Sequence, residues 1–217
     1  MTDFTHARKL MVDNQLRTSG ITDRRLLGAM GRVPREHFVP PARQPLAYID
    51  EAHPISATRK LGPPAPFAKL IQLATIESTD FVLDLGCGTG YSSAVIGELA
   101  ERVVAVEEDA ALASAARKAL AALGAGNVSV VEGKLTTAGA EQGPYDVIVV
   151  EGTLREVPQA LFDQLKPEGR LVAYIGVERR VPVAHLFAKS GEGVAARADF
   201  DGRLPPLVKS ENDSFVF

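Results

Sequence analysis

The residues with the clearest chemical potential lie in one short glycine-rich stretch. The string V-L-D-L-G-C-G-T-G-Y covers residues 82–91 and places Gly86, Gly88 and Gly90 directly after an apolar run. Glycines permit a tight turn and let a ligand approach the backbone closely, and a helix that follows such a turn offers free N–H groups. We therefore expect this stretch to bind a small ligand that lies against the backbone.

Two acidic residues accompany the glycines. Asp84 lies just before the turn, and Glu107 follows Gly86 by 21 residues, at the expected end of the next apolar run. A carboxylate at that spacing can accept hydrogen bonds from both hydroxyls of a ribose. A dinucleotide fold needs G-x-G-x-x-G, whereas bulky Tyr91 follows the third glycine here, and Asp84 suits a cationic ligand better than a pyrophosphate. The pattern therefore disfavours a dehydrogenase.

The elements that must position these residues alternate regularly along the chain. Near-continuous apolar runs separated by amphipathic stretches predict a parallel sheet that is covered on both faces. After Gly176 the periodicity becomes two-fold, which predicts an antiparallel hairpin at one edge of the sheet. The expected strands are residues 80–85, 102–106, 127–131, 145–150 and 170–175, the expected helices are residues 67–76, 91–100, 110–123 and 158–165, and the hairpin is residues 183–188 and 194–200. The fold class is thus α/β, a Rossmann-like, doubly wound and mostly parallel sheet.

Residues 1–66 have a different pattern. Apolar residues recur at helical spacing over residues 4–16, and Thr22 or Asp23 can cap a second short helix. Eight of the fourteen prolines then lie between residues 33 and 66, which excludes a long helix or a central strand. We predict a helical and proline-rich N-terminal cover over residues 1–66 and a ligand-binding domain over residues 67–217.

Together these features resemble the class I S-adenosylmethionine-dependent methyltransferases. The resemblance rests on Asp84, the glycine turn and Glu107, with the strand Y-D-V-I at residues 145–148 and the turn K-P-E-G-R-L at residues 166–171. It implies S-adenosyl-L-methionine as cofactor, with Asp84 and the turn at the methionine part and Glu107 at the ribose. The expected cofactor-binding residues are Asp84, Gly86, Cys87, Gly88, Gly90, Tyr91, Glu107, Gly133, Lys134 and Glu151.

A narrower resemblance extends into the N-terminal region. Over roughly residues 8–175 the chain is similar to the protein-L-isoaspartate O-methyltransferase family, as a divergent member. This resemblance implies methyl transfer to a carboxylate of damaged, isoaspartyl protein, and hence a role in protein repair. The matching stretches are M-V-D-N-Q-L at 11–16, V-P-R-E-H-F-V-P at 33–40, A-Y at 47–48, P-Y-D at 144–146, E-V-P at 156–158 and Q-L-K-P at 164–167.

The chain departs from this family in two places. The family has a Q-T-I-S-x-P segment before the helix that precedes its first strand, with the serine near the transferred methyl. Counting back from Phe67 puts that segment on residues 59–64 and the serine on Gly62; using Ser56 instead requires a shift of six residues. The family's G-D-G after the third strand, with its aspartate toward the adenine, is G-K-L at residues 133–135 here.

The acceptor site is less well defined by the residues. His53, Arg59 and Lys60 in the cover are candidates for substrate contact. A carboxylate acceptor has a pKa near 4 and is ionised at pH 7, so its methylation needs no general base. Three functions stay open: transfer to isoaspartyl protein, transfer to another, small-molecule acceptor, and S-adenosylmethionine binding without catalysis.

Composition narrows the partners and the compartment. The 217 residues carry 24 basic and 27 acidic side chains, a net charge of −3, which predicts no nucleic-acid or membrane partner. The single cysteine, Cys87, cannot form an internal disulfide, and no Cys/His cluster has metal-ligand spacing. We therefore expect a cytoplasmic protein without a metal, with a protein, peptide or small-molecule acceptor as partner; the oligomeric state is left open.

Overall fold

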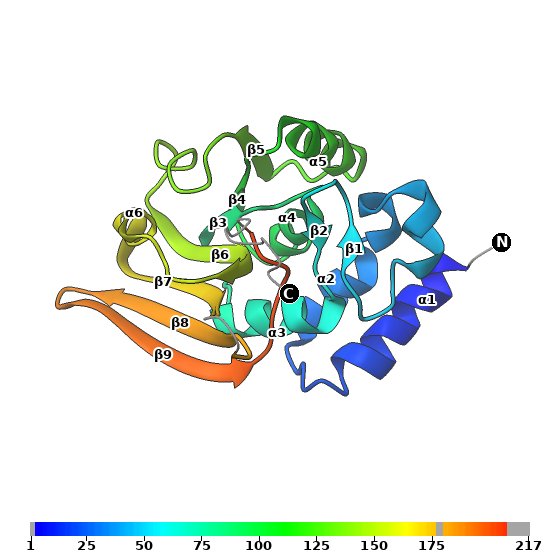
Figure 1. Ribbon diagram of the computed structural model, residues 1–217, viewed down its shortest axis with the longest axis horizontal. Helices are drawn as coiled ribbons and strands as arrows, with labels where there is room; N and C mark the ends of the chain where they lie inside the picture. Colours follow the sequence, from blue (N-terminus) through cyan, green and yellow to red (C-terminus); the bar gives the residue numbers. More distant parts are fainter. Residues whose placement is uncertain (1–2, 177–179, 208–217) are drawn as a thin grey trace, which may run out of the picture.

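In the computed structural model, which describes residues 3–176 and 180–207, a seven-stranded sheet lies at the centre of the protein (Figure 1). The strand order is β5-β4-β3-β6-β7-β8-β9. Neighbours from β5 to β7 are parallel, whereas β8 and β9 are antiparallel to their neighbours. The strands are β3 (Phe81–Leu85), β4 (Arg102–Glu107), β5 (Val128–Glu132), β6 (Tyr145–Leu154), β7 (Leu165–Ile175), β8 (Val183–Ser190) and β9 (Gly193–Asp201). The predicted α/β, Rossmann-like sheet with an antiparallel edge hairpin is confirmed.

Alternate residues of the central strands belong to two different buried clusters. Val82 and Val103 lie in the cluster that includes α3, α4 and the N-terminal helices, whereas Leu83 and Val104 lie in the cluster that includes α6. Burial on both faces explains why these strands are near-continuous apolar runs. Because β3 pairs in parallel with both β4 and β6, the carboxyl end of β3 is the place where such a fold binds its ligand.

The helices begin where the sequence offers a suitable first residue. Asp109 caps α5 by accepting from the N–H groups of Ala111 (2.9 Å) and Leu112 (3.1 Å). Helix α3 starts at Pro64, three residues before the predicted start, because proline is tolerated in a first turn. The helices are α1 (Phe4–Met11), continued by the π-helical η1 (Val12–Leu16), α2 (Arg24–Arg32), α3 (Pro64–Ala74), α4 (Tyr91–Gly97), α5 (Ala110–Ala122) and α6 (Gln159–Asp163).

The proline-rich segment folds into short elements that pack on the domain. Two 3-10 turns, η2 (Arg35–Phe38) and η3 (Pro41–Leu46), precede a two-stranded ribbon of β1 (His53–Pro54) and β2 (Lys60–Leu61). Buried residues of this segment, such as Phe38, share one cluster with α3 and the sheet. The predicted boundary between residues 66 and 67 lies inside α3, and the division into two parts stays a prediction that extends beyond the described residues.

After β9 the chain returns to the carboxyl end of β6, a path that the sequence patterns did not predict. In Figure 1 this segment, residues 202–207, is the orange-red coil that runs from the end of β9 toward the centre. Thr153 donates from its backbone N–H to Pro205 O (3.2 Å) and from Oγ1 to Leu204 O (2.6 Å). A Cβ placed on Gly152 would lie 2.7 Å from Leu207 Cβ, so the segment packs tightly against β6.

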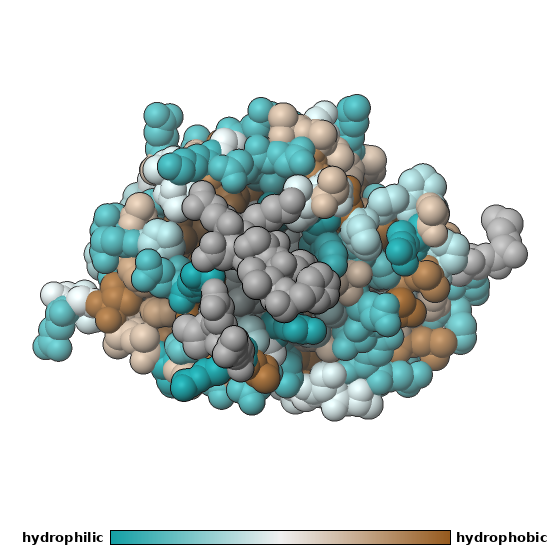
Figure 2. Space-filling model, in the orientation of Figure 1, coloured by the Kyte–Doolittle hydropathy of each residue, from teal (hydrophilic) through white to brown (hydrophobic). Residues whose placement is uncertain are grey.

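The surface of the described part is mixed in character. Figure 2 shows hydrophilic side chains along much of the upper rim, near β5 and α5, and hydrophobic side chains over the N-terminal helices at the right. Among the described residues of this N-terminal region, the exposed large apolar side chains are Leu10, Leu46 and Ile49. No described helix has the length and apolar character needed to cross a membrane.

Candidate functional site

The glycine-rich turn connects β3 to α4 and adopts backbone conformations that favour glycine. The φ angles are +79° at Gly86, +57° at Gly88 and +95° at Gly90. A Cβ placed on Gly88 would lie 2.7 Å from Ile55 Cδ1, and one on Gly86 would overlap Leu207 Cδ1. The turn is therefore enclosed by the β1–β2 ribbon on one side and by the C-terminal segment on the other.

Asp84, the fourth residue of β3, offers one unused carboxylate oxygen at this turn. Its Oδ2 accepts from Ser92 Oγ (2.7 Å) and Ser93 Oγ (2.5 Å), whereas Oδ1 has no partner among the described residues. Burial raises the pKa of Asp84 to about 6. A buried oxygen without a partner is costly unless a ligand satisfies it, and a carboxylate oxygen suits an ammonium group.

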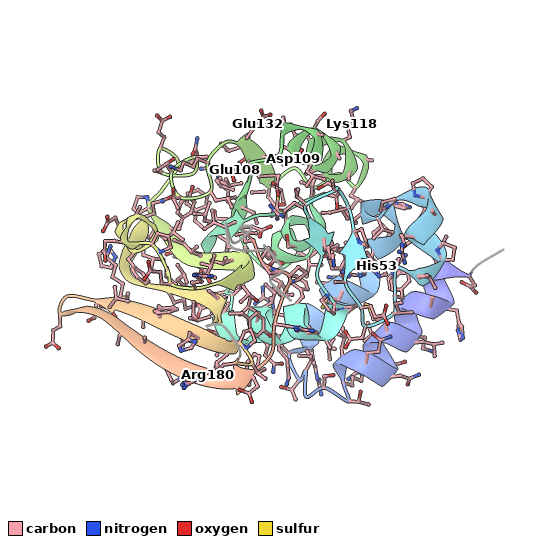
Figure 3. The ribbon with its side chains drawn as sticks, in the orientation of Figure 1. His53, Glu108, Asp109, Lys118, Glu132 and Arg180 are labelled. Carbon is pink, nitrogen blue, oxygen red and sulfur yellow. The ribbon has the colours of Figure 1, made fainter. Side chains whose placement is uncertain are left out.

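Glu107, the last residue of β4, is buried beside the same turn. Its Oε1 accepts from Glu108 N (2.9 Å), Asp109 N (3.0 Å) and Arg59 Nη1 (3.0 Å), and its Oε2 accepts from Gly88 N (2.8 Å). Figure 3 shows Glu108 and Asp109 in this region, beneath α5. The structure thus brings Glu107 to the glycine turn, at the end of the strand next to that of Asp84.

Arg59 enters this region from the β1–β2 ribbon. Besides the ion pair with Glu107, its Nη2 donates to Gly86 O (2.7 Å). Glu151, on β6, has an Oε1 that is shielded from solvent and has no partner in the described part of the chain. Burial and the charge of Asp84 raise the pKa of Glu151, while Arg59 favours its ionised form. Arg59 thus pairs with Glu107 and also favours the ionised forms of Asp84 and Glu151 on the neighbouring strands β3 and β6.

Tyr91 and Cys87 pack into the core around the turn. The ring of Tyr91 lies 5.6 Å from that of Phe38 and 5.7 Å from that of Phe67, measured between centroids. Cys87 N donates to Val106 O (3.2 Å), and burial raises the pKa of the Cys87 thiol. Tyr91 thus connects the cover to the domain, and its expected contact with the methionine chain stays a prediction.

The residues after β5 lie next to Glu107, because β5 is the neighbour of β4 in the sheet. Gly133 N donates to Glu107 O (3.1 Å), so the end of β5 is held against the end of β4. Lys134 is exposed, and its carbonyl oxygen accepts from the N–H groups of Thr137 (3.0 Å) and Ala138 (2.8 Å). Lys134 therefore begins a turn, and its expected place near the adenine stays a prediction.

Of the remaining substrate candidates, His53 is buried and Lys60 is exposed. Only 1% of the His53 surface is accessible, and burial, together with the charges of Arg35 and Arg43, lowers its pKa to about 4. Figure 3 shows His53 on the side of the N-terminal helices, away from Glu108 and Asp109. The expected contact of His53 with the substrate stays a prediction.

The two candidates for the family's serine position have different surroundings. Ser56 Oγ accepts from Arg59 N (3.1 Å) and Thr58 N (3.3 Å), so this hydroxyl stabilises the ribbon turn. Gly62 directly precedes the Pro63 N-cap of α3, and a Cβ there would lie 2.5 Å from Leu204 Cδ2. The assignment of the family's serine position to Gly62 stays a prediction.

Sequence reasoning missed two groups that shape the site. Arg35 is fully buried, donates to Ala47 O (2.8 Å), and lies 4.6 Å from the centroid of the Tyr91 ring. The stretch V-P-R-E-H-F-V-P pointed to a buried Arg35, because a charged residue that lies between apolar residues is buried with them and then needs hydrogen-bond partners. Leu207, which packs against Gly86, was also missed. The sequence indicated it only through two leucines that flank a pair of prolines in L-P-P-L at residues 204–207.

The fold and the site together define a class I methyltransferase: a parallel sheet with a glycine turn after β3, Asp84 before the turn and Glu107 at the end of β4. The family model described as Protein-L-isoaspartate(D-aspartate) O-methyltransferase matches residues 6–212. The chain belongs to this family, whose members use S-adenosylmethionine as methyl donor, as the resemblance implied.

Relatives match over nearly the whole chain. A protein-L-isoaspartate O-methyltransferase of Koribacter versatilis is 37% identical over 214 residues, 99% of this chain and 96% of the relative. One of Rhodopseudomonas palustris is 38% identical over 202 residues, 93% of each chain. The matches therefore include the cover as well as the sheet.

Solved structures share the fold. A protein-L-isoaspartate O-methyltransferase superposes with a TM-score of 0.79 at 27% identity; the match covers 92% of this chain and 65% of that longer one. A second, from Plasmodium falciparum in complex with S-adenosyl-L-homocysteine, has a TM-score of 0.79 at 21% identity and covers 94% of this chain and 99% of that one.

The residues around the turn fit S-adenosylmethionine, except that Arg59 already contacts Glu107. The unused oxygen of Asp84 suits its ammonium group, the glycines admit a ligand against the backbone, and Glu107 suits its ribose hydroxyls. Arg59 already occupies Oε1 of Glu107. A ribose hydroxyl bound at Oε1 of Glu107 would therefore have to replace this contact of Arg59.

Proposed function

We propose that this chain transfers a methyl group from S-adenosylmethionine to a carboxylate of isoaspartyl-containing protein or peptide. One observation carries the proposal: Asp84, the glycine turn and Glu107 meet at the carboxyl ends of adjacent parallel strands. The proposal is supported by relatives named for this activity, which are 37–38% identical over most of the chain.

The chemistry requires this protein to hold and shield its reactants. When bound, the cofactor supplies a methyl group that is already activated by a sulfonium charge. An acceptor carboxylate is ionised at pH 7, so no side chain has to remove a proton. Holding the two groups in line at short range can supply roughly 7–11 kcal/mol of the barrier. Asp84 and Glu107 hold the cofactor, while the β1–β2 ribbon and residues 202–207 exclude water.

Glu151 favours a second candidate, methyl transfer to a neutral small-molecule acceptor. Its Oε1 is shielded from solvent and lacks a partner among the described residues, and β6 lies beside β3, where Asp84 already carries a carboxyl group. A carboxylate in this position can accept the proton of an acceptor hydroxyl. In its ionised form the same group opposes binding of an anionic acceptor.

The deciding experiment measures methyl transfer from labelled S-adenosylmethionine to an isoaspartyl peptide, its normal aspartyl twin and a pool of small hydroxyl compounds. Wild type is compared with Glu151→Gln and with Glu156→Gln, an exposed control nearby. Transfer to the isoaspartyl peptide alone, increased in Glu151→Gln, supports the first function. Transfer to a hydroxyl compound that Glu151→Gln abolishes supports the second. Cofactor binding without any transfer favours a non-catalytic binding protein.

The cellular setting belongs to the same proposal. A cytoplasmic location is supported by a single, buried cysteine, and the net charge of −3 gives no basis for nucleic-acid binding. The acceptor is then a protein or peptide that reaches the site past the N-terminal cover.

A further inference from the structure

Arg59 contacts Glu107, the residue expected to bind the cofactor ribose. Its Nη1 donates to Glu107 Oε1 (3.0 Å) and its Nη2 donates to Gly86 O (2.7 Å), while 11% of its side chain is exposed. Glu107 also accepts from Gly88 N and from two further backbone N–H groups. Both oxygens of Glu107 thus accept from backbone N–H groups, and Arg59 is the one side chain among the described residues that donates to Glu107.

The backbone holds Arg59 in this position. Arg59 N donates to Ser56 Oγ (3.1 Å), and Arg59 O accepts from the N–H groups of Ile55 (3.0 Å) and Ser56 (3.2 Å). Ile55 packs against Gly88 on the other side of the turn. The backbone of the turn at residues 55–59 is therefore fixed by its own hydrogen bonds, and it holds the guanidinium of Arg59 in the site.

The charge of Arg59 also matches that of the ligand. Besides its pair with Glu107, it lies close enough to Asp84 and Glu151 to favour their ionised forms. S-adenosylmethionine brings two cationic groups of its own, the sulfonium and the ammonium. Arg59 thus offsets part of the negative charge around the turn in the free protein.

We propose that Arg59 is a built-in competitor of the cofactor, which occupies Glu107 in the free protein and lowers the affinity for S-adenosylmethionine until the ribose displaces it. The inference rests on the cofactor of the proposed function and not on its acceptor. On the predicted alignment, Arg59 falls at the first position of the segment that reads Q-T-I-S-x-P in the family, so Arg59→Gln places the family's neutral side chain there.

The test measures cofactor binding by calorimetry, with S-adenosylmethionine and with S-adenosylhomocysteine, which has the same ribose and is not consumed. Arg59→Gln is expected to bind both roughly tenfold or more tightly, because breaking a hydrogen bond between charged groups costs at least that factor. Arg59→Lys keeps the positive charge but lacks the planar guanidinium with its two donor nitrogens. Its cofactor affinity is expected to lie between those of Arg59→Gln and wild type. Arg117→Gln, which removes a half-exposed arginine paired with Glu132 at 3.6 Å, is the matched control and should bind like wild type.

Thermal unfolding separates competition from a structural role. Without cofactor, Arg59→Gln is expected to melt below wild type, and saturating cofactor is expected to raise its melting temperature by the larger amount. Unchanged or weaker binding in Arg59→Gln, with the same loss of thermal stability, would show that Arg59 only supports the fold and would overturn the inference. Absence of binding in both proteins would overturn the cofactor site as well. Tighter binding with no transfer to an isoaspartyl peptide would refute the proposed acceptor and leave the inference standing.

Discussion

His53 makes the stability of the protein depend on pH. The side chain is 1% exposed, and its Nε2 has no partner in the part of the chain that the structure describes. Burial, with the nearby charges of Arg35 and Arg43, lowers the pKa of His53 to about 4, against about 6.5 for an exposed histidine. The unfolded chain therefore takes up a proton near pH 6.5, whereas the folded protein does not do so until about pH 4.

The sign and size of the effect follow from this difference. As pH falls, the unfolded state binds more protons than the folded state, so stability is lost across the window from pH 6.5 to pH 4. The loss is about 2 kcal/mol between pH 7 and pH 5, and about 3 kcal/mol by pH 4. Burial raises the pKa values of Asp84 and Glu151, and raised pKa values of acids give the opposite slope. The effect of His53 must therefore be isolated by a variant.

The assay is urea unfolding of wild type and His53→Leu at pH 7, 6 and 5, with His37→Leu as a control that removes an exposed histidine. Leucine fills the buried site and cannot bind a proton, so His53→Leu should gain about 2 kcal/mol relative to wild type between pH 7 and pH 5. Parallel curves for the two proteins would refute the reasoning. An NMR titration that places the pKa of His53 near 6.5 would refute it independently.

Further outcomes are expected at the glycine turn. Gly88→Ala should weaken cofactor binding in calorimetry at least tenfold and lower the melting temperature, because φ is +57° and the new Cβ would meet Ile55 Cδ1 at 2.7 Å; unchanged binding would contradict this. Asp84→Asn should stabilise the free protein against urea at pH 8, where a buried acid of raised pKa is costly, and should weaken binding; a loss of stability would count against the pKa shift. Leu207→Ala should cost about 2 kcal/mol in urea unfolding, since Leu207 is buried against Gly86, and a cost near zero would show that the segment is loosely held.

The sheet was predictable because burial on both faces leaves a simple pattern. Strands β3 and β4 begin and end within one residue of their predicted limits, since each is a nearly continuous apolar run next to a turn. Strand β6 extends to Leu154, four residues beyond its predicted end, across a register shift between Val149 and Thr153. An irregularity of that kind depends on the neighbouring strand and leaves no periodic signal in the sequence.

The candidate site was predictable only in part, for a related reason. Asp84 and Glu107 follow from spacing alone, because the carboxyl ends of adjacent parallel strands meet at one edge of the sheet. The ion pair between Arg59 and Glu107 joins residues that are 48 apart in the sequence, and no local sequence pattern predicts it. The packing of Leu207 on Gly86 likewise depends on the path of the chain after β9.

The return of residues 202–207 to Thr153 has a consequence for the order in which the protein is made. Thr153 Oγ1 reaches Leu204 O across 51 residues of sequence, and contacts of such separation form after the local ones. During synthesis, strands β3 to β6 can assemble while the wall of the site at Leu207 has not yet left the ribosome. A growing chain can therefore pair these strands before it has the residues that complete the wall of its site.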